Sequence, residues 1–188
     1  MSEIAASSQV PIAHTVSATV EDWSREAKPM FAWDPSRALL ASLRDYQRVA
    51  QSPYPWHLIA RKWAVLRHRF WSVVTGADIP LNCRIAGGLL MPHPNGIVIH
   101  PAAEIGPNCL IFQQVTIAAT DAGAPRIGGH VDIGAGAKLL GAIRIGEGVR
   151  IGANAVVVDS FAGGCTVGGI PAKILLRRGA EPAPVDVP

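Results

Sequence analysis

An apolar residue recurs every six positions through most of the second half of this chain. Between residues 127 and 157 the repeat starts are Ile127, Ile133, Leu139, Ile145, Ile151 and Val157. The same period runs upstream through Ile99, Ile105, Ile111 and Ile117, and before that through Ile79, Ile85 and Met91. Neither the period of two of a half-buried strand nor the 3.6-residue period of a helix explains this spacing. A six-residue repeat predicts a parallel β-helix, in which each unit is one short strand and one turn.

The apolar repeat residue is expected to point inward, together with the residue four positions later. Gly or Asn between the two allows the tight turn that each corner needs. Three units make one coil of eighteen residues, and stacked coils bury a continuous aliphatic column. We therefore expect a mainly β protein, in which residues 77–176 form the β-helix.

Residues 1–76 predict a small α-helical region in front of the β-helix. About the first 18 residues are polar and small and are expected to be disordered. Residues 19–28 are expected to form a short helix. In the next helix, Asp34 is the expected N-cap and Pro35 the first helical residue. At the other end, "IPAKIL" is expected to close the β-helix, and residues 177–188 to form a flexible, Pro-rich tail.

A third segment, residues 56–75, carries an apolar stripe at helical spacing. Its members are Trp56, Ile59, Trp63, Leu66, Phe70 and Val73. We expect this helix to dock through the stripe and to leave its four cations in solvent. The alternative is a basic helix that lies on a membrane surface.

Composition and cysteine spacing narrow the class of protein. A formal net charge of +3 is too small to predict nucleic-acid binding, and no apolar run is long enough to span a membrane. The start of the chain does not resemble a signal peptide, so a cytoplasmic protein is expected. Membrane association is not expected, because the helix of residues 56–75 is expected to dock through its stripe. Cys83 and Cys109 occupy the inward fourth position, which predicts core thiols and not acyl carriers. Cys165 is also expected to be structural, so neither disulfides nor a zinc site are predicted.

The six-residue register slips at two places. Ile117 and Ile127 are ten residues apart, which predicts a protruding loop over residues 120–125. Met91 and Ile99 are eight apart, so two extra residues fall within "PHPNG". Insertions in repeat proteins collect on the functional face, and His93 lies inside this one, between two prolines. His93 is therefore the first candidate for a catalytic base.

Three stretches together resemble the serine acetyltransferase family. They are "DIPLNCRIAGGLLMPHPNGIVIHPAAEIGPNCLIFQQVTI", "IGAGAKLLGAIRIGEGVRIGANAVV" and "GGIPAKIL", within about residues 77–176. The resemblance implies a left-handed β-helix, assembly into homotrimers or dimers of trimers, and acetyl-CoA in a groove between neighbouring subunits. It also implies that His93, in the H-x-x-G-I-V motif, is the general base. Asp78, fifteen residues upstream, then orients the imidazole and stabilises its charged form.

The same resemblance implies the contacts of CoA. Ala135 and Ala153, in the "IGAGA" and "IGANA" turns, would offer backbone groups to the pantetheine arm. Lys173 would meet the phosphates, aided by Arg177 or Arg178. No metal is expected, and the group that stabilises the oxyanion is not identified.

Two positions depart from the pattern of the serine-specific members. The Arg-His pair that holds the amino acid is replaced by Gly123-Ala124, and the acidic residue before the catalytic histidine is Pro92. The acceptor therefore stays open between L-serine, in cysteine biosynthesis, and a sugar or exopolysaccharide precursor. A non-catalytic β-helix scaffold is a further alternative.

A γ-type carbonic anhydrase is another enzyme with such repeats. It binds a metal through three histidines, for which His93, His100 and His130 are the candidates. Their separations of 7 and 30 residues lack the close pair of that family.

Overall fold

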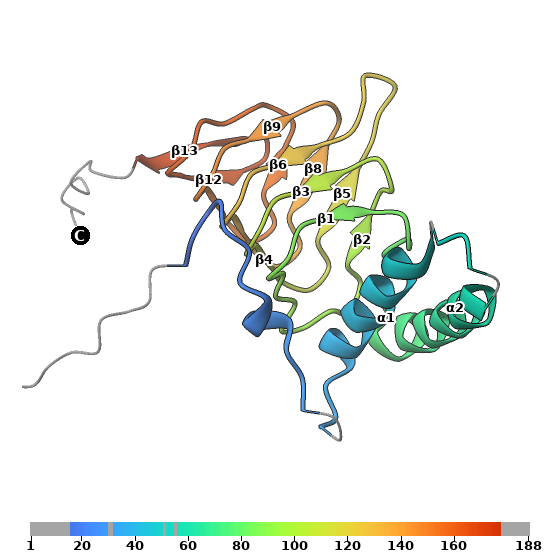
Figure 1. The fold of residues 1–188 in the computed structure, drawn as a ribbon. Helices are drawn as coiled ribbons and strands as arrows, with labels where there is room; N and C mark the ends of the chain where they lie inside the picture. The colour runs from blue at the N-terminus through green and yellow to red at the C-terminus, as the bar shows by residue number, and fades with distance from the viewer. Residues whose placement is uncertain (1–15, 30–31, 51, 55, 178–188) are drawn as a thin grey trace, which may run out of the picture.

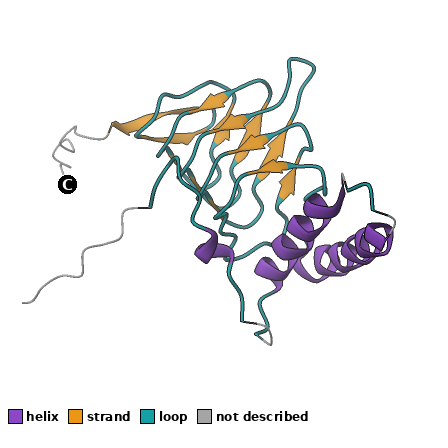
Figure 2. Cartoon of the chain, viewed as in Figure 1, coloured by secondary structure: helices purple, strands orange, loops and turns teal. Residues whose placement is uncertain are grey.

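The structure, a computed structural model, describes residues 16–29, 32–50, 52–54 and 56–177. A β-helix makes up most of it, and two α-helices cover the end at which the coils begin (Figures 1 and 2). The helices are η1 (Trp23–Glu26, a 3-10 turn), α1 (Pro35–Ala50) and α2 (Trp56–Thr75). The predicted fold, a parallel β-helix preceded by a small helical region, is confirmed.

Three parallel sheets form the walls of the β-helix. The first contains β1 (Arg84–Ile85), β3 (Glu104–Ile105), β6 (Arg126–Ile127) and β9 (Arg144–Ile145). The second contains β4 (Leu110–Ile111), β7 (Asp132–Ile133), β10 (Arg150–Ile151), β12 (Cys165–Gly169) and β13 (Ala172–Arg177). The third contains β2 (Val98–Ile99), β5 (Thr116–Ala118), β8 (Lys138–Leu140) and β11 (Val156–Val157). Only β13, which folds back on β12, is antiparallel within this set of described strands.

The repeat residues point inward, as the six-residue pattern predicts. Ile111, Ile117 and Ile133 are fully buried, and so are Val131 and Val149 at the fourth position. Asn or Gly stands in the left-handed region just before many of the fourth-position residues, for example Asn108, Gly136 and Asn154. At Gly136 a side chain would also collide with the next coil, because its Cβ would lie 2.2 Å from the Asn154 side chain.

Both register slips are visible in the strand pairing. Leu90 pairs with Leu110 and Val98 with Thr116, so the turn of residues 91–97 is two residues longer than the turn above it. The other slip forms a tight turn, in which the backbones of Thr120 and Gly123 bond to each other twice, at 2.9 Å each. Both insertions thus lie at corners and leave the strands in register.

Helix α1 begins as the sequence predicts. Asp34 Oδ1 accepts a hydrogen bond from the backbone N–H of Arg37 at 3.0 Å, which satisfies one of the free donors of the first turn. Leu39, Leu40 and Leu43 then join the aliphatic core of the β-helix. This packing explains why the helix closes the open end of the first coil.

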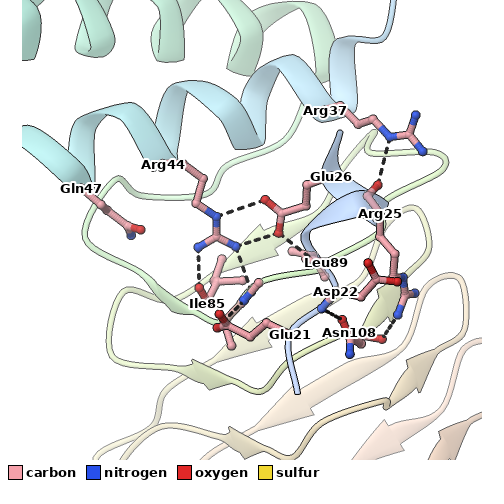
Figure 3. A network of polar contacts seen from close by, with 12 residues as sticks. Glu21, Asp22, Arg25, Glu26, Arg37, Arg44, Gln47, Ile85, Leu89 and Asn108 are labelled. Atoms are coloured by element: carbon pink, nitrogen blue, oxygen red, sulfur yellow. Dashed lines mark hydrogen bonds and ion pairs between the residues drawn. The ribbon is translucent and has the colours of Figure 1, made fainter. Parts of the chain in front are cut away.

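The predicted helix over residues 19–28 is wrong, because this segment is a strap with a single 3-10 turn. The Asp22 side chain caps that turn at the N–H of Ser24, and other polar groups of the segment bind the β-helix and α1 (Figure 3). Asn108 accepts from the N–H of Asp22 at 2.9 Å, and Glu26 accepts from the N–H of Leu89 at 3.1 Å. Glu26 also pairs with Arg44 of α1 at 2.9 Å, and both side chains are nearly buried.

The prediction that α2 docks through its apolar stripe is also wrong. The face that packs inward contains the buried residues Ala64, His68 and Thr75, while the stripe on the opposite face is exposed to solvent. Ala64 and His68 occupy the side of the helix that meets α1 and the first coil, and Trp71 on the same side packs against the core. Among the described residues, no helix is both long and apolar enough to cross a membrane.

The three cysteines lie in the core as free thiols, as predicted. Burial raises the pKa of Cys83 to about 12, and the nearby charge of Asp78 adds to this increase. Burial likewise raises the pKa of Cys109 to about 11. A thiol held neutral in this way is a poor nucleophile, which agrees with a structural role.

Candidate active site

His93 lies at the corner of the β-helix between the second and third sheets. This corner, called the His93 corner below, contains residues 92–96, 113–114, 135–136 and 153–154, one pair or turn from each successive coil. Backbone hydrogen bonds connect its levels: Gln114 N–H to Asn95 at 2.9 Å, Gly136 N–H to Gln113 at 2.9 Å and Asn154 N–H to Ala135 at 2.8 Å. The sequence-predicted residues His93, Ala135 and Ala153 therefore lie in one column.

The column is long and its upper part is built from small residues. From His93 to Ala153 it rises by three coil spacings of about 4.8 Å, or roughly 14 Å. Ala153 is exposed and Ala135 is half-buried, each beside a Gly that leaves the backbone accessible. A narrow, extended molecule can therefore lie against the corner with its reactive end near His93.

A pocket of about 560 Å³ opens beside His93. Its walls come from the 92–95 turn, from the start of α1 with Asp34 and Ser36, and from the end of α2 with Thr75. This volume lies within the range of ordinary small-molecule sites. The exposed imidazole of His93 is thus accessible from the pocket as well as from the column.

Asp78 begins the third sheet, directly below Val98. The backbones of Gly76 and Gly96 bond at 2.9 Å, so Asp78 and His93 flank the same corner on successive coils. Both side chains are exposed, and no hydrogen bond or ion pair between them occurs in the described structure. The fifteen-residue spacing therefore brings the pair to one corner without fixing a contact in the isolated chain.

Lys173 lies at the far end of the β-helix, on β13, where it pairs with Gly168 of β12. Its Nζ is 3.6 Å from Asp159 Oδ2, and both side chains are largely exposed. An exposed ion pair of this kind contributes little and is easily exchanged for another anion. The side chain of Arg177 and all of Arg178 lie outside the described residues.

The other singled-out residues lie away from the His93 corner. His100 is at the corner between the third and first sheets, where its Nδ1 accepts from the N–H of Ala102 at 3.1 Å. His130 is at the corner between the first and second sheets, so the three candidate metal histidines occupy three different corners. Gly123 and Ala124 belong to the turn of the first of these corners and do not line the pocket.

The acidic residue of the pocket wall was missed by the sequence analysis. Asp34 was interpreted only as the N-cap of α1, yet the half-buried carboxylate also lines the pocket beside His93. It is 59 residues before His93, and nothing in the hexapeptide pattern connects the two. Only the folding of α1 onto the first coil brings them together.

The chemistry available at this corner is proton transfer combined with alignment of two molecules. An imidazole can accept a hydroxyl proton near neutral pH. The pocket can hold the molecule that carries the hydroxyl, and the column can hold a second, extended molecule. The described structure therefore combines a β-helix of six-residue repeats with a corner suited to such a transfer.

Comparison with known proteins shows which of them the chain resembles. The chain is 41% identical over 118 residues to the serine acetyltransferase of Synechococcus elongatus, covering 61% of this chain and 48% of that protein. It superimposes on the serine acetyltransferase of Neisseria gonorrhoeae in complex with serine with a TM-score of 0.64, at 32% identity, covering 77% of this chain and 58% of the other. A serine acetyltransferase in complex with CoA gives a TM-score of 0.63, at 30% identity, with 76% and 57% covered.

The chain is thus similar to serine acetyltransferases over its β-helix, as the sequence motifs predict. It spans about half the length of the first of these relatives. No protein-family model matches it.

Proposed function

We propose that this protein is an O-acetyltransferase that moves the acetyl group of acetyl-CoA to the hydroxyl of L-serine, the first step toward cysteine. The observation that carries the proposal is the convergence on one corner of His93, a pocket and a column of small residues. The similarity to serine acetyltransferases supports the choice of serine and of acetyl-CoA, since relatives of known structure bind serine and CoA.

In the proposed reaction, both substrates are bound at the same time. His93 takes the hydroxyl proton of the acceptor as its oxygen attacks the thioester carbonyl of acetyl-CoA. The carbon–sulfur bond then breaks, and the proton passes from the imidazolium to the departing CoA sulfur. Asp78 holds the imidazole in place once the site is assembled, and Asp34, in the pocket wall, is placed to meet the amino group of serine.

CoA is proposed to lie along the His93 corner. Its pantetheine arm would contact the backbone at Ala135 and Ala153, and Lys173 at the end of the β-helix would exchange Asp159 for a CoA phosphate. The roughly 14 Å from His93 to Ala153 suits an extended arm whose thioester reaches the base. We also propose a cytoplasmic location, because the three cysteines are free thiols.

We further propose a homotrimer, or a dimer of trimers. The His93 corner is convex in one chain, so it offers CoA only one wall, and a neighbouring subunit is needed for the second. The turn with Gly123 and Ala124, which lies at another corner, could then reach the site of the next subunit. A monomeric mass by light scattering at the working concentration of the enzyme would contradict this assembly.

A second candidate acceptor is a sugar hydroxyl, as in exopolysaccharide precursors. Pro92 lines the pocket where an acidic contact is expected, and Gly123-Ala124 replaces the Arg-His pair. A pocket of about 560 Å³ is also larger than one small amino acid requires.

The two acceptors are distinguished by release of the CoA thiol from acetyl-CoA in the presence of L-serine or of a panel of sugars. The proposal expects saturable release with L-serine, with a KM within the usual range of roughly 1 μM to 1 mM. Saturation by a sugar, with no response to L-serine, would replace serine by the second candidate.

A further inference from the structure

The outward face of α2 carries a long exposed apolar stripe that has no role in the proposed reaction. Six large apolar side chains on this face are between 56% and 84% exposed: Trp56, Ile59, Trp63, Leu66, Phe70 and Val73. They lie within about a third of the helix circumference, because successive residues are about 100° apart. Single exposed apolar residues are ordinary, but a continuous stripe of this length marks a surface that binds something.

Aromatic residues extend the stripe at its N-terminal end. Tyr54 stacks on Trp56 with ring centroids 4.8 Å apart, and both rings are more than half exposed. Tyr and Trp combine an apolar body with one polar group, which suits them to the boundary between water and lipid. The stripe therefore has the side chains of an interfacial helix.

The charges of α2 all have one sign. The helix contains Arg61, Lys62, Arg67 and Arg69 and neither Asp nor Glu. Arg67 is paired with Asp45 of α1 at 2.9 Å, whereas Lys62 and Arg69 are exposed and make no ion pair with any described residue. At 100° per residue, these two cations lie directly beside the stripe. An apolar stripe bordered by cations is complementary to a surface of anionic headgroups.

We propose that α2 binds flat on the surface of a membrane that contains anionic lipids, with its stripe among the acyl chains and Lys62 and Arg69 at the headgroups. The inference is independent of the proposed function and reverses the expectation that membrane association is absent, which depended on an inward-facing stripe. Pairing of two α2 stripes from separate copies is disfavoured, because it brings Lys62 and Arg69 of both helices close together and α2 contains no acid to compensate them.

Co-sedimentation with lipid vesicles tests the proposal on the full chain. The protein is expected to sediment with vesicles of phosphatidylcholine mixed with phosphatidylglycerol, and much less with phosphatidylcholine alone or at high salt. Lys62→Gln/Arg69→Gln should weaken binding to the mixed vesicles by about fivefold for each cation. Arg144→Gln, which removes an exposed cation of the first sheet, is the matched control and should bind like the wild type.

A second variant tests the apolar stripe. Trp63→Gln/Phe70→Gln should lower vesicle binding by roughly tenfold or more. Val158→Gln, at an exposed apolar residue of the β-helix, is the matched control. Circular dichroism checks that each variant is folded. We expect all of them to fold, because the replaced side chains are exposed.

Two results would overturn the proposal. One is a wild-type protein that stays in the supernatant with both kinds of vesicle. The other is a Trp63→Gln/Phe70→Gln variant whose vesicle binding is unchanged, or whose only change is a smaller assembly by light scattering. The last outcome would assign the stripe to contacts between copies of this chain.

Discussion

At the residue scale, Asp78 is the site residue whose role depends most on assembly and substrate. It flanks the same corner as His93 but makes no contact with it in the single chain. If Asp78 orients and stabilises the His93 imidazolium in the complete site, Asp78→Asn should lower kcat and leave the KM for acetyl-CoA almost unchanged. A structural role would instead lower the free energy of unfolding together with kcat.

Urea unfolding of the same variant separates this role from a structural one. An Asp78→Asn variant that loses kcat and free energy of unfolding together would show that Asp78 acts on folding or packing, and not on the base.

His68 carries a second prediction at this scale. It is buried between α2, α1 and the first coil, with Nε2 donating to the Ile79 carbonyl at 2.8 Å and Nδ1 3.2 Å from the Ser42 hydroxyl. Burial lowers its pKa below the ordinary 6.5, against smaller opposite effects of Ile79 and Asp78. The unfolded chain therefore binds a proton more readily, so the free energy of unfolding should fall as the pH drops below about 6.5.

Urea unfolding above and below that pH measures this effect. The pH-dependent loss of stability should be smaller in His68→Gln than in the wild type. Equal losses in the two proteins would assign the pH dependence to other groups.

At the scale of elements, the strap of residues 16–29 is held by a pair that is nearly removed from water. Arg44 of α1 pairs with Glu26 and donates to the carbonyls of Ile85 and Ala86 (Figure 3). Arg44→Met leaves the Glu26 carboxylate without its partner and should cost about 3–5 kcal/mol of the free energy of unfolding. Arg44→Met/Glu26→Gln should recover part of this loss in the same urea titration, whereas equal stability of Arg44→Met and wild type would contradict the account.

The corner column makes a prediction at the same scale. Ala153→Trp places a large ring where the arm of CoA is proposed to lie, and should raise the KM for acetyl-CoA roughly tenfold or more. Ala162→Trp, at an exposed position on another part of the β-helix, should leave it near the wild-type value. An unchanged KM in Ala153→Trp would remove CoA from this column.

The elements also show what a sequence can predict. The six-residue pattern located the β-helix, its inward residues and both slips, because in a repeat fold each residue's environment is set by its neighbours in the repeat. The predictions for the strap and for the docking face of α2 were wrong for the same physical reason. Both elements pack against segments that are distant in the sequence, and the local pattern does not show those contacts. In the strap, Asn108 accepts a hydrogen bond that a longer helix would form within itself. In α2, packing of Ala64, His68 and Trp71 against α1 and the first coil leaves the apolar stripe facing outward.

At the scale of the whole molecule, the site is assembled by the way α1 and α2 close the first coil. His93 and the Ala135–Ala153 column could be found from the repeat, since they share one corner. Asp34 and the pocket could not, because they depend on long-range packing of α1 against the 92–95 turn. The same packing turns the stripe of α2 away from the site, so catalysis and membrane binding can be altered separately.

The central claim is that His93 is the base of an acetyl transfer at this corner. The most direct measurement is thiol release from acetyl-CoA with L-serine by His93→Ala, alongside CoA binding measured by calorimetry. We predict a kcat lower by about 10²–10⁴-fold with CoA affinity unchanged. Turnover close to that of the wild type would contradict the assignment of His93, and with it the proposed site.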